Sequence, residues 1–278
     1  MSINPKELTV LFITFNRSDM LERSFQAIKS CQELKDVKVI VSDDCSKAEH
    51  LDRIRYMGFD QVISAERNGG LGKNNNKGLR AVSSEFCLMV QDDCMLATPD
   101  AVSRSLKILK ADPSIGMVRL NGDVDVFPLV RREAGGMPYW VCDHTSEAYA
   151  QLKQQPGKRL RVYSDQPHVR RTSLHERVVG YYVEGTPMEQ SEMDYEDRMD
   201  AQGELFVAFL NPTPFEHFVH AGGADVSFRA RKMRYRMDRF ILNFVNAMGL
   251  KRLPIYASVR SAYRVFQQAL MRLGVIKP

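Results

Sequence analysis

The sequence has little of what marks secreted, membrane-spanning or zinc-binding proteins. No stretch approaches the roughly 18 consecutive apolar residues of a spanning helix, and the opening MSINPKEL lacks the basic-then-apolar layout of a signal peptide. The five cysteines form no CxxC pair, and an odd number fits neither a disulfide framework nor a zinc site. These absences predict a cytoplasmic protein.

Basic residues exceed acidic ones only at the end of the chain. The 278 residues carry a net charge of +5, yet residues 229–278 hold 12 Lys or Arg against one acid, Asp238. Residues 1–228 therefore carry a net charge of −6. This acidic body lacks the aromatic-basic pattern of RNA-binding domains, so nucleic acid is not an expected partner.

The tail over 229–278 contains two apolar stripes at helical spacing among its arginines. One interpretation is a pair of helices packed on the body with solvated basic residues. The other is a helix pair that lies on an anionic membrane surface. The sequence leaves both open.

Short apolar runs alternate with helix-like stretches through the first 120 residues. The strands are predicted over 8–14, 37–41, 60–64, 86–90 and 115–120, with helices from Ser18 and over 48–58, 73–83 and 100–110. Continuous Val/Ile/Leu-rich runs separated by single helices predict an α/β fold with a mostly parallel central sheet covered by helices.

The alternation stops after residue 121. Residues 122–188 are rich in Gly, Pro, Arg and aromatics, and we predict loops and short strands that shape a binding surface. A helix over 189–202, ended by Gly203, and a strand over 205–210 follow.

Two predicted strands end in adjacent carboxylates, Asp43-Asp44 and Asp92-Asp93. Ligands of such sheets bind beyond the carboxyl ends of the strands. Magnesium is commonly held by one or two carboxylates together with the phosphates of a substrate. The two acid pairs therefore predict a divalent cation and a phosphate-bearing ligand at this edge.

The glycine-rich stretch NGGLGK at 68–73 matches neither common phosphate-binding signature. Asn75 stands where GxGxxG needs its third glycine, and Arg67 and Asn74 occupy required positions of GxxxxGK[ST]. The stretch is either a flexible turn before a helix or a backbone that approaches a ligand closely.

Four segments together resemble family 2 glycosyltransferases, in the order typical of that family. They are LTVLFITFNR at 8–17, VIVSDDCS at 39–46, NGGLGKNNNKGL at 68–79 and FCLMVQDDC at 86–94. The resemblance implies a GT-A fold, a nucleotide-sugar donor, and Mg²⁺ or Mn²⁺ at the diphosphate. It also implies that a GT-A domain over 1–228 divides into a donor-binding half (1–121) and an acceptor-binding half (122–228).

The resemblance places five residues at the donor. Phe15 and Arg17 border the nucleoside, and Asp44 binds the base or the ribose. Asp92 faces the ribose or the donor sugar, while Lys73 is a donor contact by its position. From the residues themselves, Phe15 could equally be a core residue and Arg17 a helix-start residue.

The metal ligands implied by the resemblance are Asp93 and His220. His220 begins an H-x-G-G segment, where many enzymes of this fold place a late histidine on the metal or the diphosphate. A structural role for the imidazole remains the alternative.

The catalytic base is expected in QSEMDYEDRMDAQG, at 190–203. The segment resembles the family pattern E-D-x-D-L-x-x-R, with Asp194 and Arg198 matching, so Glu192 stands where inverting members carry a catalytic Asp. Asp194 and Arg198 are i,i+4 neighbours that can pair, which leaves Glu192 available at the helix N-terminus. The alternative is an acid that complements the helix dipole.

Three residues of the irregular segment are candidates for the acceptor site: Trp140, His168 and His175. Trp140 could stack on a sugar face or pack in the core.

The sequence thus predicts a metal-dependent, inverting glycosyltransferase that moves a sugar from a nucleotide-sugar to a glycan or lipid-linked acceptor. Its expected place is bacterial-type envelope polysaccharide synthesis, with the tail at the inner face of the membrane. One alternative is a nucleotidyltransferase of related fold, although TFNRSD at 14–19 lacks the glycines of a phosphate loop. The other is a non-catalytic, membrane-associated subunit that binds nucleotide-sugar.

Overall fold

The computed structural model describes residues 3–122, 127–154, 162–212 and 215–220. The described residues belong to one compact unit. The predicted tail over 229–278 lies outside the described residues. Among the described residues, no helix has both the length and the apolar character needed to cross a bilayer.

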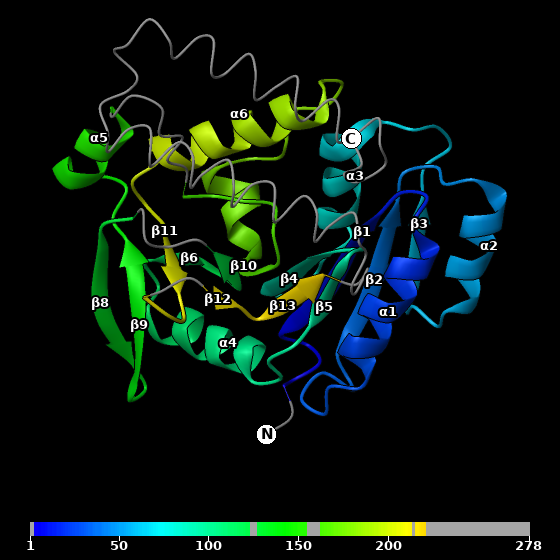
Figure 1. Ribbon diagram of the computed structural model, residues 1–278, viewed down its shortest axis with the longest axis horizontal. Helices are drawn as coiled ribbons and strands as arrows, with labels where there is room; N and C mark the ends of the chain where they lie inside the picture. The colour runs from blue at the N-terminus through cyan, green and yellow to red at the C-terminus, as the bar shows by residue number, and fades with distance from the viewer. Residues whose placement is uncertain (1–2, 123–126, 155–161, 213–214, 221–278) are drawn as a thin grey trace, which may run out of the picture. The chain divides into compact units, whose positions relative to one another are not determined.

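One nine-stranded sheet runs through the compact unit in the order β3-β2-β1-β4-β10-β6-β11-β9-β8 (Figure 1). Within this sheet only β9 and β10 run against the common direction. The sheet is therefore mixed, with most strands parallel in direction, as predicted. Its strands are β1 (Leu8–Thr14), β2 (Lys38–Asp43), β3 (Gln61–Ser64), β4 (Phe86–Gln91), β6 (Ile115–Arg119), β8 (Leu129–Ala134), β9 (Met137–Cys142), β10 (His168–Arg171) and β11 (Phe206–Phe209).

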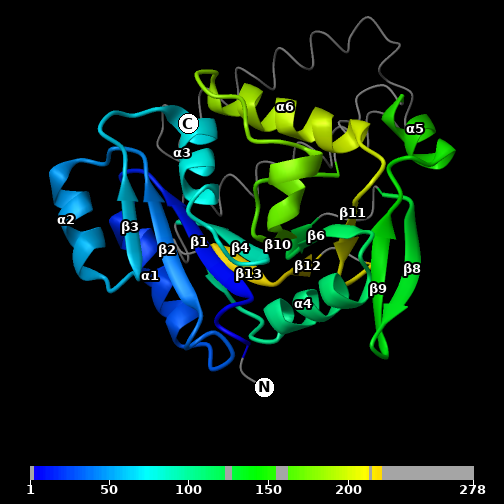
Figure 2. The same cartoon turned by 180° about the vertical axis from the view of Figure 1, so that it is seen from behind.

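Helices cover both faces of the sheet, as Figures 1 and 2 show from opposite sides. One face carries α1 (Ser18–Lys29), α2 (Ala48–Tyr56) and α4 (Ala101–Ala111), and the other carries α3 (Gly70–Leu79), α5 (Glu147–Lys153), the π-helix η2 (Leu174–Val178) and α6 (Met188–Ala201). Successive side chains of β1 point to opposite faces. Val10 and Phe12 thus share a core with Phe25 of α1, whereas Leu11 shares the second core with Leu79 of α3.

Helix α3 begins at Gly70, three residues before the predicted start at Lys73. The Asp44 carboxylate accepts hydrogen bonds from the backbone N–H groups of Gly69 and Gly70. An anion at this position satisfies amides that lack partners inside the helix. A tertiary contact therefore extends the helix into a glycine pair whose own preference is for a turn.

The segment over 122–188 holds more regular structure than the predicted loops and short strands. It contains the β8–β9 hairpin, α5, η2 and β10, and β10 lies in the middle of the sheet between β4 and β6. Two of the four residues of β10 are arginines, so the sequence gives no sign of a buried central strand. Arg170 is fully buried, and its guanidinium donates to the hydroxyl of Tyr195.

Two short ladders complete the unit: β7 (Asn121–Gly122) pairs with β12 (Phe215–Glu216), and β5 (Cys94–Leu96) pairs with β13 (Phe218–His220). The second ladder sets His220 opposite Cys94, directly after the turn that ends β4. A late segment of the chain is thereby held at the edge where the acid pair lies.

Candidate active site

Asp92 is held at the carboxyl end of β4 by the neighbouring strand β1. One of its carboxylate oxygens accepts from the Thr14 hydroxyl at 2.9 Å and from the Phe15 backbone N–H at 3.4 Å. Burial raises the pKa of Asp92 to about 6, while Arg17 and the Thr14 bond act in the opposite direction. This carboxylate is thus oriented before any ligand binds.

Arg17 supplies the positive charge that offsets the adjacent acids. Its Nη1 lies 3.4 Å from Oδ1 of Asp92 and 3.3 Å from Oδ2 of Asp93. The side chain of Arg17 is 55% exposed, against 7% for Asp92 and 25% for Asp93. Asp93 is therefore the member of the pair that a ligand can reach more readily.

His220 approaches the same carboxylate from β13. Its Nε2 lies 3.5 Å from Oδ2 of Asp93. A carboxylate and an imidazole are both donors for divalent cations, so the predicted ligands Asp93 and His220 lie together. In the described part of the chain, no three His, Cys, Asp or Glu side chains gather closely enough to hold a metal by themselves. The donor set fits a cation that completes its coordination with ligand oxygens.

Asp44 lies at the end of β2, next to β1 in the sheet. Its two oxygens accept from the N–H groups of Gly69 at 2.9 Å and Gly70 at 2.8 Å. Lys73 lies one turn further along α3. The two adjacent acids have different partners. Asp43 accepts hydrogen bonds from the backbone N–H and the hydroxyl of Ser46 and so shapes the turn after β2.

Phe15 follows β1 and is 42% exposed, which is unusual for so large an apolar side chain. The next residue, Asn16, has φ of 55°, a left-handed conformation that is uncommon outside glycine. Its N–H donates to Ser46 at 2.7 Å, and its side-chain oxygen accepts from the Lys47 N–H at 2.8 Å. These bonds join the ends of β1 and β2 and leave an aromatic ring on the surface beside Asp92.

Glu192 is half-buried in the first part of α6, and its Oε1 accepts from the backbone N–H of Asp165 at 3.3 Å. Asp194 instead pairs with Arg198 at 2.7 Å. Arg198 also donates to the carbonyl oxygen of Tyr181 at 2.8 Å. Asp194 therefore belongs to a structural cluster, and Glu192 stands outside it.

Of the three acceptor candidates, two are buried and the third lies on a distant strand of the sheet. His168 and His175 are fully buried, so an acceptor could not touch them in this structure. Burial lowers the pKa of both imidazoles to about 3, helped by the charge of Arg170. Trp140 lies on β9, four strands from β4, a separation of roughly 19 Å at ordinary strand spacing. None of the three is assigned to the site.

Sequence reasoning missed Asp165, whose backbone N–H contacts Glu192. It lies in an irregular stretch before β10 and accepts hydrogen bonds from the hydroxyls of Tyr163 and Tyr182. A lone acid among loop residues carries no pattern from which this contact could be predicted.

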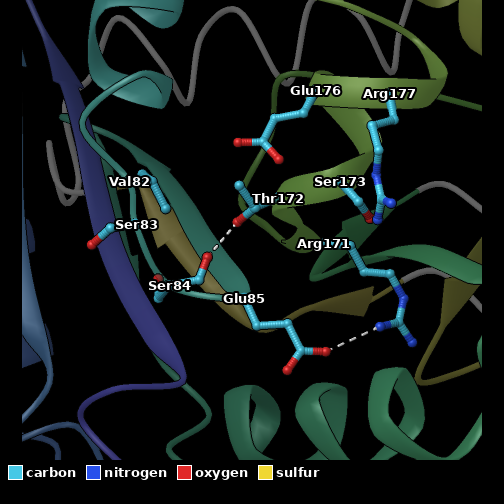
Figure 3. A pocket seen from close by; sticks show the side chains of 9 residues that line it. All are labelled: Val82, Ser83, Ser84, Glu85, Arg171, Thr172, Ser173, Glu176 and Arg177. Carbon is cyan, nitrogen blue, oxygen red and sulfur yellow. Dashed lines mark hydrogen bonds and ion pairs between the residues drawn. The ribbon is translucent and has the colours of Figure 1, made fainter.

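A cavity of about 330 Å³ opens at the opposite end of β4 (Figure 3). The six residues of β4 span roughly 20 Å, so this cavity is remote from Asp92. Two pairs of its polar groups bind each other: Thr172 donates to the carbonyl oxygen of Ser84 at 2.6 Å, and Arg171 pairs with Glu85 at 3.5 Å. The acid pairs Asp43-Asp44 and Asp92-Asp93 lie at the other ends of the strands.

The arrangement agrees with a known family. Residues 9–177 match the family described as Glycosyl transferase family 2, which is more than half of the chain. The chain belongs to this family. An uncharacterized glycosyltransferase of Haemophilus influenzae is 25% identical over 112 residues, which are 40% of this chain and 37% of the relative. The match thus spans about a third of the length of that relative.

Solved structures of similar fold are also glycosyltransferases. A mannosyltransferase of Pyrobaculum calidifontis, solved with GDP-Man and Mn²⁺, superposes with a TM-score of 0.52 at 16% identity, over 83% of this chain and 61% of that one. Glucosyl-3-phosphoglycerate synthase of Mycobacterium tuberculosis, solved with Mg²⁺ and UDP, gives 0.51 at 17% identity, over 77% and 71%. The predicted GT-A fold is confirmed. Membership of this family disfavours the nucleotidyltransferase alternative.

Proposed function

We propose that this family 2 member transfers a sugar from a nucleotide-sugar to an acceptor hydroxyl, with a divalent cation and with inversion at the anomeric carbon. The observation that carries the proposal is the cluster of Arg17, Asp92, Asp93 and His220 at one strand edge. It combines fixed carboxylates, an imidazole and a guanidinium, which suits a ligand that brings phosphates and a cation together.

The donor would lie over the ends of β1 and β2. The exposed ring of Phe15 suits stacking on a base. Asp44 uses both carboxylate oxygens on Gly69 and Gly70, yet each oxygen has a second lone pair for a base N–H or a ribose hydroxyl. Lys73 would add a positive charge near the donor. The presence of GDP-Man and UDP in similar solved structures supports this class of ligand.

Asp93 and His220 would hold the cation, and Mn²⁺ or Mg²⁺ in similar structures supports its identity. When bound, the cation offsets the negative charge that develops on the departing nucleoside diphosphate. Arg17 adds a second positive group at the same carboxylates. Asp92, fixed by Thr14 and the Phe15 amide, would orient the donor sugar or ribose.

Glu192 would act as the general base. As the acceptor oxygen attacks the anomeric carbon, its proton passes to the Glu192 carboxylate. The bond between that carbon and the diphosphate oxygen breaks, and its electron pair leaves with the nucleoside diphosphate. Attack opposite the leaving group inverts the configuration.

The acceptor would be a glycan or a lipid-linked saccharide of envelope polysaccharide synthesis. This part of the proposal rests on the charge of the tail, which carries 12 basic residues against one acid over 229–278. Such a segment is attracted to anionic lipid and would hold the enzyme where lipid-linked acceptors are presented.

The test is a panel of nucleotide-sugars incubated with the full chain in Mn²⁺, Mg²⁺ or EDTA. We expect cation-dependent release of nucleoside diphosphate from one donor, and NMR of the product should show the inverted anomer. Thermal stabilisation by a donor without turnover on any acceptor would instead support the non-catalytic binding subunit. Retention at the anomeric carbon would contradict the role of Glu192.

A further inference from the structure

The cavity at the start of β4 is a second place in the fold that can hold a ligand. It lies between residues 82–85, which lead into β4, and residues 171–177, which end β10 and form η2 (Figure 3). Its volume of about 330 Å³ falls at the lower end of the roughly 300–1,000 Å³ of pockets that bind small molecules. Asp92 and Asp93 follow the far end of β4, so a ligand here would be separate from the donor.

The two walls of this cavity are fastened to each other. Phe86 of β4 pairs with Arg171 of β10 in the sheet. Thr172 donates its backbone N–H to the carbonyl oxygen of Glu85 at 2.9 Å. The Arg171 guanidinium donates to the carbonyl oxygen of Ile115, also at 2.9 Å. The walls are therefore set before a ligand binds, which limits the ordering cost of binding.

Four polar side chains of the lining make no hydrogen bond or ion pair within the described part of the chain. They are Ser83, Ser173, Glu176 and Arg177. Glu176 and Arg177 are exposed, and Figure 3 shows the Glu176 carboxylate pointing from η2 toward the wall formed by residues 82–85. An exposed charge needs no partner in the protein, so the evidence for a function comes from the helix that carries these two residues.

Glu176 and Arg177 belong to η2, which is a π-helical turn. The backbone N–H of Val179 donates to the carbonyl oxygen of Leu174, five residues before it, at 2.8 Å. Such turns are rare and occur frequently at functional sites. The same turn buries His175, whose ring nitrogens have no hydrogen-bond partner among the described residues, and this is unfavourable. A turn that stabilises the fold so poorly points to a function for the side chains that it presents to the cavity.

The charges of the lining select the class of ligand. The described lining carries two guanidinium groups and two carboxylates, those of Arg171, Arg177, Glu85 and Glu176. A phosphate would meet the carboxylates, an ammonium group would meet the guanidinium groups, and both meetings are unfavourable. Val82 is the one apolar side chain among the described residues of the lining, so an apolar ligand finds little to contact. A neutral ligand with many hydroxyls fits, because a hydroxyl can donate to a carboxylate and accept from a guanidinium N–H.

We propose that this cavity is a second carbohydrate site, which binds a sugar unit of the acceptor glycan through Glu176 and Arg177. The class of acceptor rests on the function proposed above. Helix α6, which carries Glu192, covers the same face of the sheet as η2 (Figures 1 and 2), so a glycan that follows this face would reach both. No bond is made or broken in the cavity, which would hold the chain while a hydroxyl reacts at the transfer site.

Saturation-transfer NMR of the full chain in EDTA, titrated with maltose, cellobiose or lactose, measures binding without turnover. We expect at least one of these disaccharides to bind, and Glu176→Ala or Arg177→Ala to weaken it about tenfold or more, the effect of losing a hydrogen bond to a charged group. Arg131→Ala is the matched control, because Arg131 lies on β8 with a side chain that is 61% exposed. Melting temperatures check that each variant is folded.

Three results of this titration would overturn the proposal. The first is that none of the disaccharides binds, and the second is that binding survives unchanged in both folded η2 variants. The third is binding of inorganic phosphate, lost in Arg177→Ala, with no disaccharide bound, which would make the cavity an anion site.

A second measurement uses transfer with an active donor. In Arg177→Ala, the KM for an oligosaccharide acceptor should rise about tenfold, while kcat and the KM for a monosaccharide glycoside stay at their wild-type values. Equal effects on the long and the short acceptor would overturn the proposal. Absence of transfer from every donor by the wild-type chain would defeat the proposed function, whereas normal transfer without disaccharide binding would defeat only the second site.

Discussion

Nε2 of His220 lies 3.5 Å from Oδ2 of Asp93, although the two residues are far apart in the chain. The ladder of β13 on β5 makes this contact. A cation held here would therefore depend on two distant parts of the chain. Loss of either donor should have the same consequence.

We expect a nucleoside diphosphate such as UDP to bind more tightly with Mn²⁺ than with EDTA, and Asp93→Ala or His220→Ala to remove that difference. Titration calorimetry measures both conditions. Asp52→Asn is the control, because Asp52 pairs with Arg55 on the surface of α2. Equal affinity for UDP in Mn²⁺ and in EDTA with the wild-type chain would contradict the metal assignment.

Glu192→Gln should abolish most of the transfer while donor binding survives. Loss of a general base typically lowers the rate by about 10²- to 10⁴-fold, far more than the roughly 0.3–1 kcal/mol of a charge at a helix terminus. The measurement is the transfer rate at saturating donor.

Asp194→Asn is the control for that substitution, because Asp194 pairs with Arg198 at 2.7 Å. It should lower the melting temperature more than the rate. Near-normal transfer by Glu192→Gln together with collapse in Asp194→Asn would move the base to Asp194.

Phe15→Ala should weaken nucleotide binding and leave stability nearly unchanged, because the ring is 42% exposed. Stacking of a base on an aromatic side chain contributes about 1–3 kcal/mol, so the expected loss of affinity is roughly 5- to 150-fold. Tyr56→Ala provides the comparison, since Tyr56 is an aromatic residue of α2 that is 90% exposed. Equal affinities for the two variants would remove Phe15 from the donor site.

His175 should make the protein less stable in acid. Its pKa is lowered to about 3 by burial and by Arg170, below the usual 6.5 of an unfolded chain. The stability is therefore fully present above pH 6.5 and is lost as the pH falls toward 3, by about 2 kcal/mol at pH 5. Urea unfolding at pH 7.5 and 5.0 measures the loss.

His175→Leu should reduce that acid loss without harming stability at pH 7.5, because neither ring nitrogen has a hydrogen-bond partner among the described residues. Replacing such a group by an apolar one of similar size is close to neutral. His168 is buried in the same way, so part of the pH dependence will remain. An unaltered slope would contradict the pKa of His175.

Removal of residues 229–278 should abolish binding to anionic vesicles and preserve nucleotide binding. The tail carries a net charge of +11, and each basic residue near an anionic surface contributes about 1 kcal/mol, which salt screens. Vesicle sedimentation at low and high salt tests this. If the full chain ignores anionic vesicles at low salt, the membrane interpretation is wrong.

The sequence alone was sufficient for features that depend on local pattern. Apolar runs bounded by polar residues located β1 and β4, because a buried strand must be apolar along its length. The acids that follow such runs were expected at one edge of the sheet, since parallel strands end together, and the structure places them there. The i,i+4 spacing of Asp194 and Arg198 predicted their pair, which the structure contains. Residues four apart on a helix are neighbours, so this contact does not depend on the rest of the fold.

Only the tertiary structure could decide which distant groups meet. The charge of Arg170 gives no sign of a buried strand, and only the fold brings its guanidinium to the hydroxyl of Tyr195 on another element. The start of α3 depends on Asp44, and the contact of Asp165 with Glu192 depends on where α6 packs. His168, a candidate by type and position in the chain, is fully buried. Each of these outcomes follows from pairing and packing between elements far apart in the chain, for which a local pattern of residues holds no information.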